Sequence, residues 1–389
     1  MFTRELKEIE TSAFLLGPRG TGKSTWIKKN YTDNTVIYDL LNTTEMIRLS
    51  RDPSLLYHET SHLPSGSWVI VDEIQKVPAL LNEVHRIIEE KKIRFILSGS
   101  SARKLRESGI NLLAGRALTY NLFPLVSKEV GFELNLERHI AFGMLPSSFL
   151  SENPKKYLQA YAETYLKEEI KEEALTRNFG NFTRFLEIAA RQNGQLTNTT
   201  AIARDAGVAR QTVQGYFDIL IDTLIGFWLK PWKLKRATKQ VSHSKFYFFD
   251  SGVVRALSGR LPYPATPEES GPLFECFIIN EIRAYLNYTE LDYPLHFWRS
   301  RNGLEVDILV ETSIGFVAIE LKNGTRWEKK FNRGMHRLAE ELGENKISCF
   351  GVFTGERQLT IDNVTIYPAI SFLKLLWSNQ IIDGRSSFG

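Results

Sequence analysis

The stretch Ala13-Phe14-Leu15-Leu16-Gly17-Pro18-Arg19-Gly20-Thr21-Gly22-Lys23-Ser24-Thr25 decides how the first part of the chain folds. Its four leading apolar residues predict a buried strand, a glycine-rich turn follows, and a helix is expected from Ser24 to Lys29. Gly17, Gly22, Lys23 and Ser24 satisfy the P-loop spacing G-x-x-x-x-G-K-[ST]. Such a turn points successive backbone N–H groups at phosphate oxygens. The residues from Gly17 to Thr25 therefore predict a site for a nucleoside triphosphate.

Two side chains of this loop have expected chemical roles. Lys23 supplies a positive charge to the β- and γ-phosphates, and the Ser24 hydroxyl holds Mg²⁺. The bare spacing also arises by chance in chains of this length. The apolar strand before the loop and the helix after it favour a nucleotide site over a glycine-rich loop without function.

The next informative feature is the apolar strand Trp68-Val-Ile-Val71, which runs into two acids, Asp72 and Glu73. In a P-loop enzyme an acid at that strand end holds the Mg²⁺ shell, and a second acid can polarise the attacking water. We assign Asp72 to Mg²⁺ binding and Glu73 to water activation. Solvated acids at a strand end are common, so this interpretation depends on the P-loop upstream.

A further strand, expected from Arg94 to Leu97, runs into the polar turn Ser98-Gly-Ser100-Ser101. In the additional-strand class of P-loop ATPases a Ser or Thr hydroxyl at this place lies beside the γ-phosphate. Ser98 is the first candidate and Ser100 the second. Phosphoryl transfer also gains from an arginine that neutralises developing charge, often from a neighbouring subunit. Arg116 is the candidate, Arg103 and Arg106 are alternatives, and any of the three is equally well explained as a surface residue.

These blocks together resemble a widespread prokaryotic family of AAA+-type ATPases, in which a C-terminal domain long labelled as of unknown function follows the ATPase. The blocks that match in order are Gly17-Pro-Arg-Gly-Thr-Gly-Lys-Ser24, Val71-Asp-Glu-Ile-Gln-Lys-Val-Pro78, Leu97-Ser-Gly-Ser-Ser101, Leu113-Ala-Gly-Arg116 and Tyr120-Asn-Leu-Phe-Pro-Leu125. The resemblance implies an AAA+ fold, hydrolysis of ATP with Mg²⁺, and a homo-oligomer, expected to be a hexameric ring. It implies no settled cellular role.

Residues 199–220 predict a helix-turn-helix in which Gly207 makes the tight turn. The basic run from Lys230 to Lys239 follows and includes an aromatic, Trp232, that is expected to be exposed. Helix-turn-helix elements also serve as plain packing modules, and the basic run also fits a solvated hairpin. The side chains expected to contact DNA are Arg210, Gln211, Gln214, Lys233, Lys235 and Arg236.

The C-terminal part has three β-like segments, of which the last two contain Asp307 and the pattern Glu320-x-Lys322. Residues two apart on a strand share a face, so Glu320 and Lys322 project together, and Asp307 on the paired strand could meet them. Two acids that bind Mg²⁺ or Mn²⁺ beside a lysine can position a water for attack on a phosphodiester. The pattern therefore predicts a metal-assisted nuclease site.

This pattern resembles the PD-(D/E)XK restriction-endonuclease-like fold, although the Pro of the motif is absent. A preceding helix in that fold often adds a glutamate. In the helix expected from Leu273 to Leu286, Glu275 fits that role better than Glu281. Two alternatives stay open, a mixed sheet with surface acids and a nuclease-like fold that binds DNA or protein without cleaving.

Composition is that of an ordinary globular protein, with a net charge of +4 and a pI near 8.8, which permits nucleic acid as a partner without requiring it. Cys276 and Cys349 are the two cysteines, so a disulfide scaffold is excluded, and the seven histidines are scattered. No apolar signal core or membrane span is expected, and a cytoplasmic location is the natural interpretation.

We therefore expect an α/β protein in three parts. These are a P-loop AAA+-type ATPase domain with a parallel sheet (1–150), a helical, winged-helix-like connector (151–240) and an α/β restriction-endonuclease-like domain (241–389). The expected function is ATP-driven movement or remodelling of DNA. The alternatives are an ATP-gated, metal-dependent nuclease in defence or repair, and an ATPase switch directed at proteins.

Overall fold

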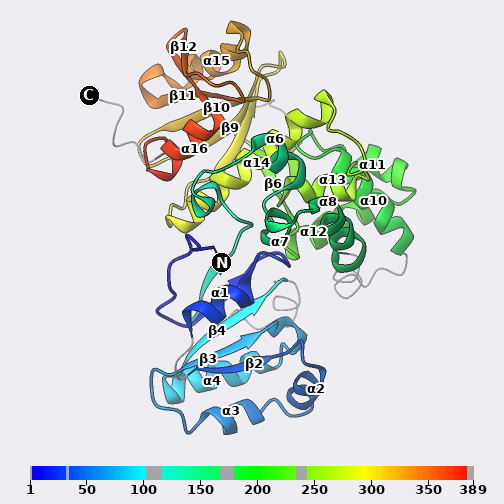
Figure 1. Cartoon of the computed structure of the whole chain (residues 1–389), viewed down its shortest axis with the longest axis vertical. Helices are drawn as coiled ribbons and strands as arrows, with labels where there is room; N and C mark the ends of the chain where they lie inside the picture. Colours follow the sequence, from blue (N-terminus) through cyan, green and yellow to red (C-terminus); the bar gives the residue numbers. More distant parts are fainter. Residues whose placement is uncertain (1, 32–34, 102–115, 167–178, 234–242, 383–389) are drawn as a thin grey trace.

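A computed structural model of the 389-residue chain describes residues 2–31, 35–101, 116–166, 179–233 and 243–382. Figure 1 shows an α/β unit at one end of the long axis, a second sheet at the other end, and a group of helices beside the second sheet. Helix α14 lies between the helical group and the second sheet. Among the described residues no helix is both long and apolar enough to cross a bilayer.

The first sheet is entirely parallel, with the order β2-β3-β4-β1-β5. Its strands are β1 (Ala13–Leu16), β2 (Thr35–Asp39), β3 (Trp68–Asp72), β4 (Arg94–Gly99) and β5 (Leu118–Asn121). The expected strands at the P-loop, at Asp72 and at Ser98 are confirmed. Because all five strands run in the same direction, the turns after β1, β3 and β4 meet at one edge of the sheet.

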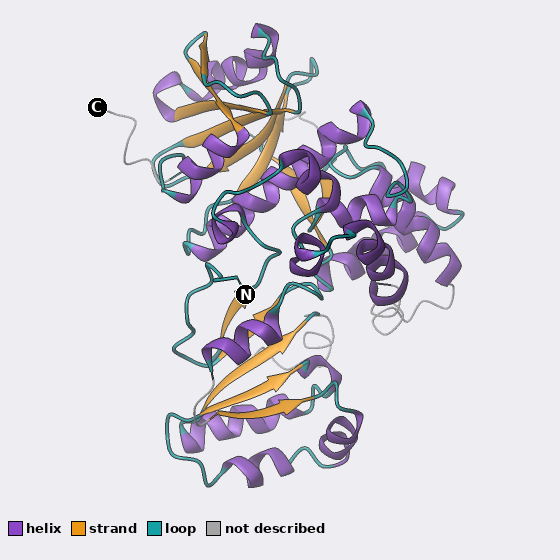
Figure 2. Cartoon of the chain, viewed as in Figure 1, coloured by secondary structure: helices purple, strands orange, loops and turns teal. Residues whose placement is uncertain are grey.

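Helices cover both faces of this sheet (Figure 2). On one face α1 (Lys23–Asn30) packs its Trp26 and Ile27 in the same core as Ala13 and Leu15. On the other face Phe14 and Leu16 share a core with α2 (Thr43–Arg51), α3 (Leu55–Thr60) and α4 (Leu80–Lys91). Burial from both sides explains why β1 and β3 are nearly continuous apolar runs.

The middle of the chain is helical, and its helix-turn-helix is present as predicted. Helix α11 (Thr199–Ala206) ends at Gly207, whose φ of 70° allows the left-handed turn, and α12 (Arg210–Asp222) follows. The other helical elements are η3 (Ser127–Val130), α6 (Leu136–Phe142), α7 (Pro146–Leu150), α8 (Pro154–Ala160), the π-helical η4 (Tyr161–Leu166), α10 (Phe179–Arg191) and α13 (Ser251–Leu257).

The second sheet is mixed, with the order β12-β13-β11-β10-β9-β8-β6-β7. Its strands are β6 (Gly226–Pro231), β7 (Lys245–Phe248), β8 (Leu295–Arg299), β9 (Glu305–Glu311), β10 (Phe316–Lys322), β11 (Ile347–Phe353), β12 (Leu359–Ile361) and β13 (Val364–Pro368). Helices α15 (Arg333–Leu342) and α16 (Ala369–Trp377) pack against it. The boundary expected between residues 240 and 241 falls between β6 and β7, which pair with each other.

Two expectations about this region are wrong. Helix α14 runs over Pro267–Tyr288, so it begins well before Leu273, because the Thr266 side chain caps it and Pro267 fits the first helical position. Trp232 is half-buried, since its ring lies 5.4 Å from that of Phe316. It is therefore part of the packing of the second sheet and not a free exposed aromatic.

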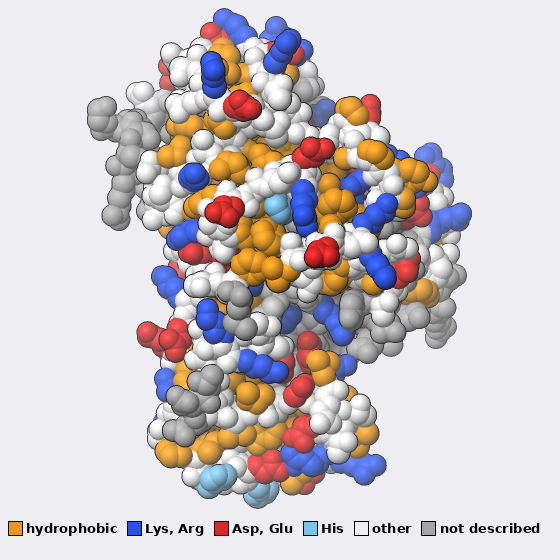
Figure 3. Space-filling model, in the orientation of Figure 1, with side chains coloured by type: hydrophobic (Ala, Val, Ile, Leu, Met, Phe, Trp, Pro, Cys, Tyr) orange, Lys and Arg blue, Asp and Glu red, His pale blue; other side chains and the backbone are white. Residues whose placement is uncertain are grey.

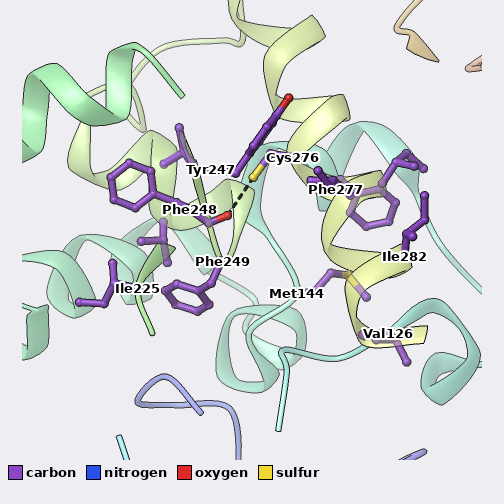
Figure 4. Close-up of a cluster of buried hydrophobic side chains, with 14 of the residues drawn as sticks. Val126, Met144, Ile225, Tyr247, Phe248, Phe249, Cys276, Phe277 and Ile282 are labelled. Carbon is purple, nitrogen blue, oxygen red and sulfur yellow. Dashed lines mark hydrogen bonds between the residues drawn. The ribbon is translucent and has the colours of Figure 1, made fainter. Parts of the chain in front are cut away.

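One apolar core joins the helical group to α14. Figure 4 shows Phe248 and Phe249 from the end of β7 and Cys276 and Phe277 from α14 directed into it, with the Cys276 thiol donating to the Phe248 carbonyl oxygen over 3.3 Å. Met144 from the helical group enters the same cluster. This shared core fixes the position of α14, which carries both Glu275 and Glu281.

Candidate functional site

The P-loop adopts the tight turn that its glycines permit. A Cβ on Gly17 would collide with the carbonyl oxygen of Leu122, and Gly22 has a left-handed φ of 95°. The buried Lys23 ammonium donates to the carbonyl oxygens of Gly17 (2.7 Å) and Pro18 (3.2 Å). Its charge therefore lies within the turn where phosphates are expected.

Three of the predicted nucleotide-site residues meet at the edge of the sheet. The Ser24 hydroxyl donates to Asp72 Oδ2 over 2.7 Å, and the Ser98 hydroxyl donates to Asp72 Oδ1. Asp72 and Ser98 are both buried. A hydroxyl and a carboxylate side by side are oxygen ligands that suit Mg²⁺, which when bound would neutralise phosphate charge. The residues present thus fit Mg²⁺ and a nucleoside triphosphate.

Glu73 follows Asp72 with a left-handed φ of 59°, which turns the chain out of β3. Its Oε2 accepts hydrogen bonds from Gln75 Nε2 and from the Ser100 hydroxyl, the latter over 3.4 Å. Glu73 therefore lies near the second serine candidate, Ser100, while Ser98 is bound to Asp72. Gln75 was not predicted, because nothing local marks it as part of the site.

Arg116 lies just before β5, and its guanidinium forms an ion pair with Glu89 of α4. Both side chains are partly exposed. The alternatives Arg103 and Arg106 lie outside the described residues. The assignment of Arg116 to a neighbouring subunit's site stays a prediction.

Two contacts hold the P-loop from outside the sheet, and neither was predicted. The Tyr161 hydroxyl donates to the Arg19 carbonyl oxygen over 2.8 Å. The Arg4 guanidinium donates to the carbonyl oxygens of Thr21 and Phe123, each over 2.6 Å, and pairs with Glu129. The loop is thus tied to both the N-terminal segment and the helical group.

In the C-terminal part, the predicted acid and lysine side chains lie together. Lys322 Nζ is 2.6 Å from Glu320 Oε1 and 3.8 Å from Asp307 Oδ2, and Asp307 Oδ2 also accepts the Leu321 N–H over 2.8 Å. Glu320 Oε2 is buried and has no hydrogen-bond partner in the part of the chain that the structure describes. An unpartnered carboxylate oxygen of this kind fits a cation.

A second lysine, Lys245 at the start of β7, lies beside these acids. It was not predicted, because the residues around it in the sequence form no recognisable motif. Its ammonium is 2.5 Å from Glu305 Oε1 and 3.8 Å from Glu275 Oε2. Glu275 also accepts the Tyr247 hydroxyl over 3.0 Å. We use the name acid–lysine cluster for Lys245, Glu275, Glu305, Asp307, Glu320 and Lys322.

Burial governs the protonation of this cluster. It raises the pKa of Glu275 to about 7 even though Lys245 opposes it, and it raises the pKa of Glu320 well above its ordinary value, with Asp307 adding to the effect. Burial alone would lower the pKa of Lys322, but Asp307 and Glu320 raise it. In the described chain no three His, Cys, Asp or Glu side chains are already arranged to hold a metal ion. Metal binding by Glu275, Asp307 and Glu320 stays a prediction.

Glu281, the less favoured glutamate of α14, has a different environment. Its carboxylate accepts hydrogen bonds from the Ser127 N–H (2.7 Å), the Ser127 hydroxyl (3.0 Å) and Trp377 Nε1 (2.9 Å). Burial raises its pKa to about 7. Glu281 therefore ties η3 and α16 to α14.

The predicted DNA-contacting side chains are accessible where the structure describes them. Arg210, Gln211 and Gln214 lie exposed on α12, and Arg210 Nε donates to the Thr199 hydroxyl over 3.2 Å. Lys233 is also exposed. Lys235 and Arg236 lie outside the described residues. DNA contact by these residues stays a prediction.

Comparison with protein-family models divides the chain into three matches. Residues 10–131, which include the P-loop, Asp72 and Ser98, match the model of an AAA domain. This part of the chain is an AAA domain, formed by the parallel five-stranded sheet. It is followed by matches to two domains of unknown function, DUF8612 over residues 133–263 and DUF4143 over residues 270–372.

Two curated relatives are similar over most of the chain. An uncharacterized protein of Mycobacterium tuberculosis and one of Mycobacterium bovis are each 28% identical over 372 residues, covering 92% of this chain and 80% of the relative. Among solved structures, the Orc1 protein of Aeropyrum pernix in complex with DNA matches at 13% identity and a TM-score of 0.26, covering 65% of this chain and 87% of that one. Can2 from Sulfobacillus thermosulfidooxidans in complex with cyclic tetra-adenylate matches at 10% identity and a TM-score of 0.22, covering 96% of this chain and 98% of that one. Similarities at such low TM-scores carry no weight for fold or function.

Proposed function

We propose that the protein hydrolyses ATP in its AAA domain and uses the energy to move or remodel DNA, or a partner bound to DNA. The observation that supports this most directly is the meeting of Ser24, Asp72 and Ser98 at the sheet edge beside the Lys23 ammonium. Lys23 would hold the β- and γ-phosphates, Ser24 and Asp72 would hold Mg²⁺, and Glu73 would orient the attacking water.

The proposed action on DNA has two supports of its own. The helix-turn-helix presents Arg210, Gln211 and Gln214 to solvent, residue types that suit phosphate and base-edge contacts. The acid–lysine cluster, in a mixed sheet, has the acids and the lysine that a metal-assisted phosphodiester site would use once a divalent cation is bound. The Tyr161–Arg19 hydrogen bond offers a route by which the P-loop could influence the helical group.

Oligomer formation belongs to the same proposal. In a hexameric ring Arg116 would leave Glu89 and reach the phosphates bound by a neighbouring subunit. The pair is partly exposed, and exposed ion pairs contribute little to stability, so the exchange would cost little.

A second candidate function is metal-dependent DNA cleavage gated by ATP. The observation that favours it is Glu320 Oε2, a buried carboxylate oxygen without a hydrogen-bond partner among the described residues. With Mg²⁺ or Mn²⁺ bound, Asp307 and Glu320 would hold the ion and Lys322 would stabilise developing negative charge. Cleavage of DNA that disappears in Asp307→Ala and Lys322→Ala would support this function.

The decisive experiment measures ATP hydrolysis without DNA and with duplex, single-stranded and branched DNA, beside Lys23→Ala. Stimulation by one form of DNA, absent in Lys23→Ala, would support a DNA-directed ATPase, and its dependence on salt would reflect phosphate contacts. Hydrolysis that is the same with every DNA form would reject the action on DNA and favour a protein-directed switch. No hydrolysis by the wild type would reject the ATPase itself.

A further inference from the structure

Cations are concentrated immediately after the Glu320-x-Lys322 motif. We use the name cationic strip for Lys322, Arg326, Lys329, Lys330 and Arg333, of which the last four are exposed. The strip covers the end of β10, the 3₁₀ turn η5 (Lys329–Asn332) and the first residue of α15. In Figure 3 Lys and Arg side chains gather at the top of the view, where Figure 1 places α15.

The strip is continuous with the acid–lysine cluster. The Lys322 ammonium that contacts Glu320 and Asp307 also lies 5.4 Å from the centre of the Phe331 ring, and the Lys330 ammonium lies at the same distance from that ring. Two cations therefore flank one half-buried aromatic ring. Such an alternation of charge and aromatic surface is typical of grooves that bind nucleic-acid strands.

The segment is held in a defined position. Trp327 is buried and donates from Nε1 to Asn332 Oδ1 over 2.9 Å, and Asn332 Nδ2 donates to the Ile361 carbonyl oxygen over 2.8 Å. Gly334 lies so close to Glu305 that a Cβ there would collide with the Glu305 carbonyl oxygen. The start of α15 is thus fixed against β9, the strand that carries Asp307.

The positive charge of the strip is only partly neutralised. Lys329 pairs with Asp362 (3.0 Å) and Lys330 with Glu328 (2.8 Å), but these are exposed pairs that contribute little. Arg326 and Arg333 form no ion pair with any residue that the structure describes. These two guanidinium groups are available to an external anion.

The position of these cations also works against the helix that they precede. A helix N-terminus carries partial positive charge, so cations there are unfavourable, and the first turn of α15 has no acid to offset them. Helix stability therefore does not explain Arg333. A bound polyanion does, because it would interact favourably with both the cations and the helix end.

We propose that the cationic strip binds the phosphodiester backbone of DNA and leads it to Lys322 at the edge of the acid–lysine cluster. The proposal rests on the proposed action on DNA and adds a surface that is separate from the helix-turn-helix. Arg326 and Arg333 contact the DNA phosphates, because the planar guanidinium group suits phosphate oxygens.

The test is binding of the full chain to fluorescent duplex and single-stranded DNA, by anisotropy, over a series of salt concentrations. The variant is Arg326→Ala/Arg333→Ala, and the matched control is Arg86→Ala/Arg191→Ala, which removes two exposed arginines from α4 and α10. Loss of two phosphate contacts should reduce the slope of log K against log[salt] by about 2 and weaken binding about tenfold at low salt. The control should retain both, and ATP hydrolysis without DNA should be the same in all three proteins.

Unchanged slope and affinity in Arg326→Ala/Arg333→Ala would overturn the inference while the action on DNA stands. An equal loss in the control would also overturn it, because net charge alone would explain the result. If the wild type binds no DNA at all, the proposed action on DNA fails together with the inference. If polyglutamate binds the wild type as well as DNA does and the variant loses both, the surface belongs to an acidic protein partner and the inference is wrong.

Discussion

The Tyr161 hydroxyl donates a hydrogen bond to the carbonyl oxygen of Arg19, 2.8 Å away, and so links the helical group to the middle of the P-loop. Tyr161 is 1% exposed, and the neighbouring Tyr157 hydroxyl would lie 3.3 Å from a Cβ placed on Gly20. The loop that is expected to bind phosphates is therefore shaped in part by residues outside the AAA domain. If nucleotide binding shifts the loop, the shift would act directly on α8 and η4, which carry Tyr157 and Tyr161.

Tyr161→Phe should weaken ATP binding. The variant lacks the hydrogen bond to the Arg19 carbonyl oxygen that helps to hold the turn. Loss of one such bond costs about 1 kcal/mol, so the KM for ATP should rise about fivefold. The control is Tyr31→Phe, because the Tyr31 hydroxyl lies at the far end of α1, where it donates to the Ile9 carbonyl oxygen over 2.8 Å and accepts from the Ile9 N–H over 2.9 Å. A similar rise of KM in Tyr31→Phe would show that the effect is general destabilisation.

Asp72→Asn should abolish most ATP hydrolysis while the fold is retained. The asparagine can still hydrogen-bond Ser24 and Ser98, but it lacks the charge to hold Mg²⁺, so kcat should fall at least about tenfold. Asp39→Asn is the control, since Asp39 is the register partner of Asp72 on the adjacent strand β2 and its side chain is exposed. Steady-state hydrolysis and thermal unfolding of both variants test this, and full activity in Asp72→Asn would contradict the assignment.

Lys245→Met should destabilise the C-terminal part strongly. The buried ammonium balances Glu305 and Glu275, and removal of one member of a buried ion pair costs about 3–5 kcal/mol. Adding Glu305→Gln should recover part of that loss, because the unpaired charge is then gone. Urea unfolding of the single and double variants measures this coupling. If the single variant were as stable as the wild type, Lys245 would not be the counter-charge of the cluster.

The stability of the protein should fall as the pH rises from 5 to 8, in part because of Glu281. Burial raises its folded-state pKa to about 7, so the carboxyl group stabilises the fold while it is protonated, and that contribution is lost as the pH passes through about 7. The loss is on the order of 2 kcal/mol. Urea unfolding of the wild type at a series of pH values measures it.

The control for this pH effect is Glu281→Gln, which does not titrate. The variant is expected to be less stable than the wild type at pH 5, because an amide cannot accept from both Ser127 and Trp377 Nε1 as the carboxyl group does. Its stability should nevertheless depend less on pH. Asp250, whose pKa burial raises to about 6, is present in both proteins and cancels from the comparison. Parallel pH profiles would show that Glu281 does not contribute.

The structural features that depend on a few neighbouring residues could be predicted from the sequence. The alternation of an apolar strand, a glycine turn and a helix located the P-loop, and acids at the ends of apolar strands located Asp72. The start of α14 was not predicted, because the helix was expected to begin at Leu273, although Pro267 fits the first position of a helix. Trp232 was expected to be exposed, because the charged residues around it give no sign that Phe316 lies beside it.

The sequence by itself determined the strand-loop-helix at Gly17–Ser24, the strand ends at Asp72 and Ser98, and the shared face of Glu320 and Lys322. Each follows from backbone geometry within a few residues, which the order of side chains specifies locally. Only the tertiary structure decided that Tyr161 reaches Arg19, that Lys245 enters the acid–lysine cluster, and that Glu281 faces Ser127 and Trp377. These partners are far apart along the chain. A periodic pattern of apolar residues shows which face of a helix or strand is buried. Which other helix or strand packs against that face depends on the packing of the whole core.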